Sequence, residues 1–249
     1  MKELVAKKGR LRRAQKLIRL VRVPLYRHGL RLGVAATIEH ARIPFGAPFR
    51  TLVDVGARHG QFALFASREF PDAAIYCLEP HPPSRTRLRS LPEFLPQIRV
   101  IPFAAADVSG EAQLFISRKT DSSSLLSIMD SYTSAFPGTG QMGVDSVETK
   151  PLDVIFAEIP VEGPVLLKID VQGTELSVLQ GAPKLLDRAD VVLVECSFLE
   201  FYRGQGLIGD VVAHLNGRFF LEGVFGLVRD RRGRCLQADL VLRRTKLAA

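Results

Sequence analysis

The strongest signal of the fold is the segment Leu52-Val-Asp-Val-Gly-Ala-Arg-His-Gly-Gln-Phe-Ala63. It has the pattern of a buried strand that ends near Asp54 and turns through Gly56 and Gly60 into an apolar helix. Gly56 permits a tight turn, and Gly60 lets the helix start approach a ligand because it has no Cβ. A second acidic residue, Glu79, closes the next apolar run, one strand-helix-strand unit farther along. The stretch predicts a nucleoside-binding loop, with Glu79 placed to bind the two hydroxyls of a ribose.

The spacing of the two glycines narrows the class of ligand. Gly-x-x-x-Gly differs from the Gly-x-Gly-x-x-Gly pattern that holds the pyrophosphate of a dinucleotide. The bound nucleoside therefore need not carry phosphates, and S-adenosylmethionine fits that description. The same spacing argues against a nicotinamide-dependent oxidoreductase.

Length and composition indicate one substantial core, since the chain has 249 residues and is 47% hydrophobic. We expect a main domain at residues 50–249 after a basic helical extension at 1–49. No apolar run approaches the roughly 18 to 20 residues of a membrane-spanning helix, and the N-terminus lacks a signal-peptide pattern. A cytoplasmic protein is expected. Cys77, Cys196 and Cys235 lie in apolar runs without metal-ligand spacing, so we interpret them as reduced core residues.

Positive charge is concentrated at the N-terminus. Residues 1–31 contain eleven lysines and arginines against the single acidic residue Glu3, whereas the whole chain has a formal net charge of +8. The rest of the chain is slightly acidic, which argues against a nucleic-acid-binding function for the whole protein. Apolar residues recur at helical spacing until Pro24 interrupts them; they are Leu4, Leu11, Ile18, Val21 and Leu25.

Two interpretations of this basic amphipathic helix remain open. In the first, it is a helix with a solvated charged face. In the second, it docks on a polyanionic partner or an anionic membrane surface, placing the protein at the inner face of the membrane. A second helix is expected at residues 30–41, followed by a proline- and glycine-rich hinge at 44–48.

From residue 50 onward, strand and helix patterns alternate as in an α/β fold with a mostly parallel sheet. The expected strands are residues 50–55, 74–79, 98–104, 165–170, 191–196, 219–228 and 236–243. The expected helices are residues 60–70, 84–91, 173–186 and 208–215. Because only a short polar turn at 229–234 joins the last two strands, they must pair antiparallel. The result is a seven-stranded, Rossmann-like sheet that ends in an antiparallel hairpin. Residues 108–150 are less regular, and we expect a short strand at 111–117 followed by a mobile cover over the ligand end of the sheet.

Several motifs together resemble the FkbM family of S-adenosylmethionine-dependent methyltransferases. They are Val53-Asp-Val-Gly-Ala-Arg-His-Gly60, Glu79-Pro-His-Pro82, residues 104–110, Leu152-Asp153 and Leu167-Lys-Ile-Asp-Val-Gln-Gly-Thr-Glu-Leu-Ser-Val-Leu-Gln-Gly-Ala182. The resemblance covers residues 51–242 and implies the fold of class I methyltransferases. The chain departs from the family pattern at Arg58, where Asn is usual, and at Gln172, where Glu is usual.

The resemblance also implies where the cofactor binds. Asp54 would face the charged amino-acid end of S-adenosylmethionine, and Glu79 the ribose. Arg58 would either pair with the carboxylate of the methionine moiety or point to solvent. The expected cofactor-binding residues are Asp54, Gly56, Ala57, Arg58, Gly60, Glu79, His81, Phe103, Ala104, Asp107 and Asp170.

Methyl transfer from a sulfonium mainly requires that the acceptor oxygen be held about 3 to 3.5 Å from the methyl group. A positioned base for a hydroxyl proton contributes about 10² to 10⁴-fold. We favour Asp170 as this base, with Glu195, His59 and Glu175 as alternatives. Asp170 has a structural interpretation too, in which it caps a helix or orders Lys168. No metal site is predicted, because Asp170 and Glu195 have no evident third ligand.

The leading prediction is an O-methyltransferase that acts on a hydroxyl of a glycan, a glycolipid or another secondary metabolite. The first alternative is an RNA or other nucleic-acid methyltransferase. The absence of a Pro-Pro-aromatic signature after the strand that ends in Asp170 argues against methylation of a base amine. The second is a non-catalytic nucleoside-binding module. The sequence names neither the acceptor nor the oligomeric state.

Overall fold

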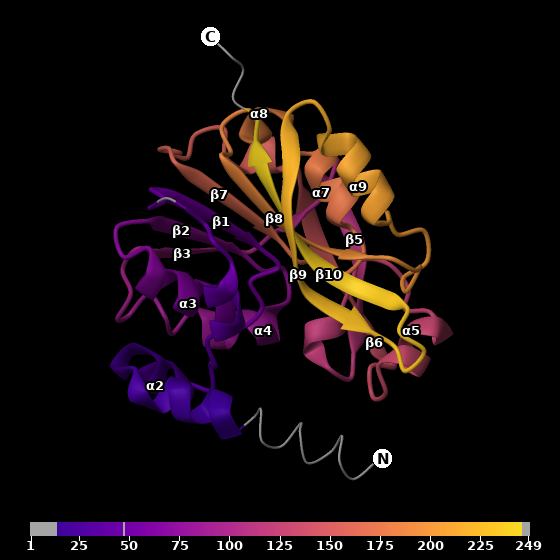
Figure 1. Ribbon diagram of the computed structural model, residues 1–249, viewed down its shortest axis with the longest axis horizontal. Helices are drawn as coiled ribbons and strands as arrows, with labels where there is room; N and C mark the ends of the chain where they lie inside the picture. The colour runs from indigo at the N-terminus through magenta and orange to yellow at the C-terminus, as the bar shows by residue number, and fades with distance from the viewer. Residues whose placement is uncertain (1–13, 47, 246–249) are drawn as a thin grey trace.

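The computed structural model describes residues 14–46 and 48–245. Its main sheet has seven strands, as predicted, and all neighbours are parallel except at the C-terminal hairpin, where β10 pairs antiparallel with both β8 and β9 (Figure 1). In spatial order the strands are β3 (Ile98–Ile101), β2 (Ala74–Leu78), β1 (Thr51–Val55), β7 (Val165–Ile169), β8 (Val191–Ser197), β10 (Cys235–Arg244) and β9 (Phe219–Arg229).

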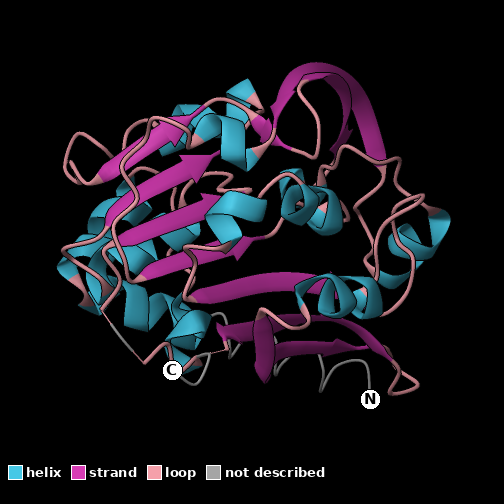
Figure 2. Ribbon diagram, turned by 90° about the horizontal axis from the view of Figure 1, so that it is seen from above, coloured by secondary structure: helices cyan, strands magenta, loops and turns pink. Residues whose placement is uncertain are grey.

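Helices cover both faces of this sheet (Figure 2). Side chains of one strand alternate between the two faces: Leu52 of β1 packs in one core cluster, and Val53 and Val55 pack in the other. The first face is covered by α3 (Gln61–Glu69), α4 (Pro82–Leu88) and the N-terminal segment, and the second by α6 (Leu152–Ile155), α7 (Glu175–Gln180), α8 (Pro183–Leu186) and α9 (Ile208–Leu215). The carboxyl ends of the central strands are left free for a site.

The N-terminal segment is helical at residues 14–22 and again in α2 (Pro24–Arg31), with Pro24 at the start of the second helix. Its buried residues Leu20, Tyr26 and Phe45 belong to the same core cluster as α3. The predicted division of the chain near residue 49 stays a prediction. The predicted amphipathic residues Leu4 and Leu11 lie outside the described residues.

The single helix predicted at residues 30–41 is wrong. Gly33, with φ of +74°, ends α2, and a separate 3-10 helix, η1 (Ile38–Arg42), follows. The single helix predicted at 173–186 is also wrong, because Gly181 separates α7 from α8. A Cβ on Gly181 would lie 2.1 Å from the carbonyl oxygen of Ala106, so only glycine fits there, and Pro183, which lacks a backbone N–H, begins α8.

The segment after β3 forms a second sheet, which the sequence did not reveal. The predicted strand at 98–104 breaks at residues 102–103, and residues 141–150, expected as part of a mobile cover, are a strand. The second sheet has the order β4 (Ala104–Ala105), β6 (Gln141–Lys150) and β5 (Gly110–Ser117). Only Val147 and Thr149 of β6 are buried, so its apolar alternation is too weak to indicate a strand.

Between β5 and β6 lie the 3-10 helix η2 (Thr120–Ser122) and helix α5 (Asp130–Ala135). The three cysteines are free, as expected, and Cys77 and Cys196 are buried. Among the described residues, no helix is both long and apolar enough to cross a membrane.

Candidate active site

The loop between β1 and α3 is shaped by its two glycines. Gly56 has φ of +80°, and a Cβ there would lie 2.0 Å from the carbonyl oxygen of Asp170. Gly60 has φ of +87°, and a Cβ there would lie 2.4 Å from Leu91 Cδ1. Both positions therefore exclude a side chain, and at Gly60 the neighbours that exclude it are Leu88 and Leu91.

Glu79 follows β2 and is only 6% exposed. Its Oε2 accepts a hydrogen bond from the backbone N–H of Arg58 (2.8 Å), and its Oε1 accepts one from the backbone N–H of His81 (2.9 Å). Burial raises the pKa of this carboxyl group, while the two N–H donors oppose the shift. Because each carboxylate oxygen has a second lone pair, both can still accept a hydrogen bond from a ligand.

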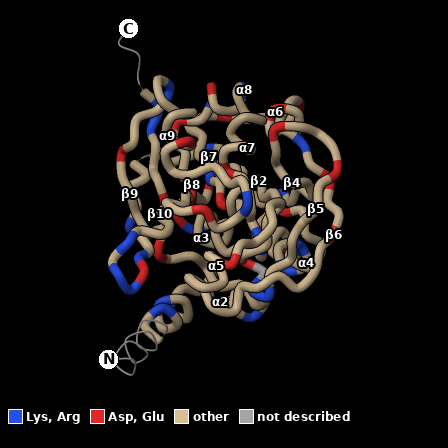
Figure 3. Tube along the Cα trace, turned by 90° about the vertical axis from the view of Figure 1, so that its right-hand side faces the viewer, with Lys and Arg blue, Asp and Glu red and all other residues tan. Residues whose placement is uncertain are grey.

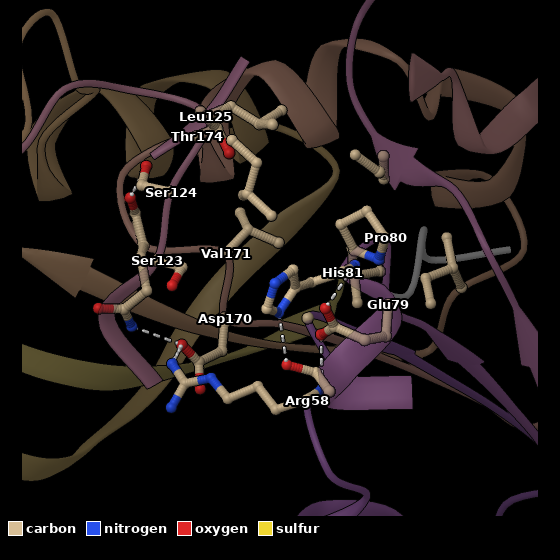
Figure 4. Close-up of a pocket in the computed structure, with 18 of the residues that line it drawn as sticks. Arg58, Glu79, Pro80, His81, Ser123, Ser124, Leu125, Asp170, Val171 and Thr174 are labelled. Atoms are coloured by element: carbon tan, nitrogen blue, oxygen red, sulfur yellow. Dashed lines mark hydrogen bonds and ion pairs between the residues drawn. The ribbon is translucent and has the colours of Figure 1, made fainter. Parts of the chain in front are cut away.

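A cavity of about 590 Å³, here named the first cavity, opens beside Glu79. Arg58, Glu79 and Asp170 lie at one end of it, and Leu125 and Thr174 lie at the other (Figure 4). Its remaining walls come from both sheets and include His81, Phe103, Ala104, Leu114 and Ser124. The first cavity is therefore charged at one end and largely apolar at the other.

His81 is buried in the wall of the first cavity. Its Nδ1 lies 3.1 Å from Ser84 Oγ, and its Nε2 lies 3.3 Å from Asp145 Oδ2, on β6. Burial lowers the pKa of His81, although Asp145 acts in the opposite direction. The second sheet thus helps to fix the orientation of this imidazole.

A second cavity adjoins the first and is lined by the loop after β1, the ends of β7 and β8, and the N-terminal segment. Gly56, Arg58 and Asp170 line both cavities, so the two meet at these residues. The charged or ionisable side chains of the second cavity are Lys16, Glu39, His40, Arg58, His59, Arg87, Asp121, Lys168, Asp170, Glu195 and Asp239.

Asp170 is held at the junction by three partners. Its Oδ1 accepts hydrogen bonds from Arg58 Nη2 (2.8 Å) and Gln172 Nε2 (2.7 Å), and its Oδ2 lies 3.7 Å from Lys168 Nζ. Burial alone would raise the pKa of Asp170, but Arg58, Lys168 and the hydrogen bond from Gln172 together lower it. A carboxylate stabilised in this way is a weak proton acceptor, which argues against Asp170 as the general base.

Gln172 links Asp170 to Glu195. Its Nε2 also donates to Glu195 Oε2 (2.7 Å), and its Oε1 accepts from the hydroxyl of Tyr202 (3.0 Å). The tyrosine therefore fixes which way the amide points. Burial, followed by the nearby charge of Asp170, raises the pKa of Glu195 well above its usual value. Glu195 thus binds a proton more tightly than Asp170 does.

Four of the predicted cofactor-binding residues do not line the first cavity. Asp54 is fully buried, with its Oδ1 2.9 Å from Lys168 Nζ, and Asp107 is exposed and accepts from Ser177 Oγ (2.7 Å). Ala57 lines the second cavity, and Gly60 packs against leucines. The geometry therefore does not place these four against a ligand in the first cavity.

The other predicted bases have different positions. His59 lines the second cavity, and its Nδ1 lies 3.2 Å from the carbonyl oxygen of Ser84. Glu175 is buried beneath the site, where it accepts hydrogen bonds from the backbone N–H of Gly173 (3.0 Å), and burial raises its pKa to about 7. Glu175 therefore stabilises the turn after β7.

Sequence reasoning missed several residues that line or order the site. Lys168 and Gln172 lie inside the quoted motif and were detectable there. Asp239 comes from a distant segment, and nothing in its local sequence marks it.

The sheet order and a cavity at the carboxyl ends of β1, β2 and β7 define a class I methyltransferase that uses S-adenosylmethionine. Residues 54–222 match the methyltransferase FkbM domain, and the chain belongs to that family.

Two curated proteins and a solved structure are similar to the chain. It is 28% identical over 206 residues to the 2-O-methyltransferase NoeI of Sinorhizobium fredii, covering 80% of this chain and 82% of that protein. It is 26% identical over 196 residues to the 31-O-demethyl-FK506 methyltransferase FkbM of Streptomyces tacrolimicus, covering 70% and 73%. A predicted O-methyltransferase from Agrobacterium tumefaciens aligns with a TM-score of 0.46 and 10% identity, covering 81% of this chain and 77% of that chain.

The residues of the first cavity fit S-adenosylmethionine. Its buried acidic residue, Glu79, suits a ribose, and its apolar end suits an adenine. The ion pair of Arg58 with Asp170 offers both signs of charge to an amino-acid group.

Proposed function

We propose that the protein is an O-methyltransferase that acts on a hydroxyl of a glycan, a glycolipid or a similarly polyhydroxylated metabolite. The observation that carries the proposal is the pair of cavities that meet at Gly56, Arg58 and Asp170. The names of two similar proteins, a 2-O-methyltransferase and a 31-O-demethyl-FK506 methyltransferase, support oxygen as the accepting atom.

In this proposal S-adenosylmethionine occupies the first cavity, where it supplies an electrophilic methyl group. Glu79 binds the ribose hydroxyls, Phe103 and Ala104 border the adenine, and His81 lies beside both. Arg58 binds the carboxylate of the methionine moiety, and Asp170 faces its ammonium group. These contacts orient the cofactor so that its reactive end lies at the junction of the two cavities.

The acceptor occupies the second cavity. Carboxylates and other polar groups dominate its lining, while Ala35, Ala57 and Phe62 are its main apolar members. Such a surface accepts hydrogen bonds from a sugar-like ring and offers little area to an apolar acceptor. Glu195 takes the hydroxyl proton, because its pKa is raised where that of Asp170 is lowered.

The proposal is tested by incubating the protein with methyl-labelled S-adenosylmethionine and separated cell fractions of glycans, lipids and RNA. We expect label in the glycan or lipid fraction as an alkali-stable methyl ether, and excess S-adenosylhomocysteine should abolish it. Label in RNA would show that the acceptor is wrong. Cofactor binding without label in any fraction would favour the non-catalytic module.

We further propose that the N-terminal helical region docks on an anionic lipid surface. Leu17 (53% exposed), Ile18 (52%) and Val21 (43%) lie on one face of the helix at residues 14–22, with Arg19 and Arg22 beside them. Figure 3 shows the basic residues of this region at the edge of the molecule. An exposed apolar face flanked by arginines is complementary to a bilayer that carries negative charge.

Vesicle co-sedimentation tests the lipid proposal. The full chain should bind phosphatidylglycerol vesicles more tightly than phosphatidylcholine vesicles, and a variant with Leu17→Ser, Ile18→Ser and Val21→Ser should bind several-fold more weakly. Leu227→Ser, on exposed β9, is the matched control and should bind normally. Equal binding by the triple variant and the parent would refute the docking surface.

A further inference from the structure

Two carboxylates lie side by side on the floor of the second cavity. Glu195 on β8 is the direct partner of Asp239 on β10 in the antiparallel register. Side chains of directly opposed residues share one face of a sheet, with Cβ atoms about 4.5 to 5.5 Å apart. Both residues line the second cavity. Two ionised carboxylates at this separation repel each other, so the pair favours holding one proton.

The N-terminal segment supplies a third member of this group. His40 of η1 places its Nε2 4.0 Å from Asp239 Oδ2, and its side chain is 13% exposed. The imidazole also packs edge-on against Phe62 of α3, with ring centroids 5.0 Å apart. A residue far from Asp239 in sequence therefore reaches the carboxylate pair.

We propose that Glu195 and Asp239 form a proton-sharing carboxylate pair that accepts the proton of the acceptor hydroxyl. This inference rests on the proposed O-methyl transfer. The O–H bond of the acceptor breaks and its proton bonds to the ionised carboxylate of the pair. The acceptor oxygen forms a bond to the methyl carbon as the carbon–sulfur bond breaks, and that electron pair stays on sulfur, which becomes a neutral thioether.

The surrounding charges suit this role. Burial and then Asp170 raise the pKa of Glu195 well above its usual value, and the same two causes raise the pKa of Asp239 to about 6. Burial and then Lys168 lower the pKa of His40. The charged groups that face the pair are Arg58 after β1, Lys168 and Asp170 of the β7 end, Glu175 of α7, Glu39 and His40 of η1, and Asp121 of η2. The pair therefore favours holding one proton more strongly than two separate exposed carboxyl groups would.

Gln172 gives the pair a fixed geometry. It donates to Glu195 Oε2, while its own oxygen is held by Tyr202. One carboxylate oxygen of Glu195 is thus anchored before any acceptor binds, which reduces the reorganisation needed for proton transfer.

The first test is a direct titration of the cofactor-free full chain, with ¹³C label in the Asp and Glu carboxyl carbons and NMR detection. We expect two carboxyl signals whose titrations are coupled and lie at higher pH than those of exposed carboxyl groups. Asp239→Asn should lower the pH at which Glu195 titrates by about one unit or more, because it removes a neighbouring negative charge. Asp72→Asn, an exposed residue away from the site, is the control and should shift neither signal. Titrations of Glu195 and Asp239 that do not affect each other would overturn the pair.

The second test uses the acceptor found by the labelling experiment. Glu195→Gln should lower kcat about 10² to 10⁴-fold. Asp239→Asn should move the acidic limb of the pH profile of kcat to lower pH by about one unit, because it removes a negative charge beside Glu195. Both variants should bind S-adenosylmethionine with the affinity of the parent. Thermal unfolding checks that each variant folds. If the parent transfers methyl groups and Asp239→Asn leaves the pH profile of kcat unchanged, the pair alone is refuted. If the two titrations are coupled but no hydroxyl is methylated, the proposed function is refuted, and with it the catalytic role of the pair.

Discussion

Glu79→Gln is expected to weaken S-adenosylmethionine binding about 10- to 100-fold. A hydrogen bond to a charged group contributes about 1.5 to 3 kcal/mol, and 1.4 kcal/mol corresponds to a factor of ten. Both oxygens of Glu79 already accept backbone N–H groups, from Arg58 and His81, while the side chain faces the first cavity. The nitrogen of a glutamine side chain cannot accept a hydrogen bond from the backbone N–H of Arg58 or His81. The change therefore weakens both the ribose contact and the hydrogen bonding that orders the loop. Isothermal calorimetry measures the affinity.

The matched control is Glu158→Gln, an exposed residue outside the first cavity. Its affinity for S-adenosylmethionine should equal that of the parent. If Glu79→Gln folds and binds the cofactor within twofold of the parent, the ribose role of Glu79 is wrong.

Lys168→Met is expected to lower the free energy of unfolding by about 3 to 5 kcal/mol. Removing one partner of a buried ion pair leaves the other charge uncompensated in a low-dielectric interior. The side chain of Lys168 is 7% exposed, that of Asp54 is 0% exposed, and their charged atoms are 2.9 Å apart. Methionine keeps most of the volume of lysine, so the loss reports the stranded carboxylate of Asp54. Urea unfolding followed by circular dichroism measures it.

The double variant Lys168→Met with Asp54→Asn isolates this pair. It should recover a large part of the lost stability, because no buried charge is left without a partner. Lys16→Met breaks the more exposed pair with Glu39 and should cost little, since solvent screens that pair. If the double variant loses as much free energy of unfolding as the two single variants together, Lys168 and Asp54 do not stabilise each other.

The sheet was largely predictable because hydrophobic periodicity is a local signal. Apolar runs ending in Asp54 and Glu79 indicated parallel strands, and the short polar turn before Cys235 required an antiparallel hairpin. The second sheet was missed because β6 buries little, so its sequence resembles a polar loop. The helix breaks at Gly33 and Gly181 were not predicted. Gly33 turns the chain with a positive φ, and Gly181 packs against the backbone of Ala106, which is distant in the sequence.

The cofactor end of the site also followed from local sequence. Gly56, Glu79 and His81 occur in recognisable motifs at fixed distances from strand ends, and the structure brings them to one cavity. Asp54 and Asp107 were assigned to the same site by motif alone, yet their carboxylates are directed to Lys168 and Ser177. A motif specifies which residue occurs at a strand end, but it does not specify which neighbour that residue contacts.

Residue type and spacing were thus sufficient for the fold class, the family and the acidic residue expected at the ribose. The choice between Asp170 and Glu195 as base required the folded chain, because a pKa depends on burial and on charges brought near by other strands. Arg58 and Lys168 hold Asp170 ionised, whereas Glu195 lies opposite Asp239, 44 residues later in the chain and adjacent only across the sheet. Proton affinity is a property of that assembled neighbourhood, and no single segment of the sequence contains it.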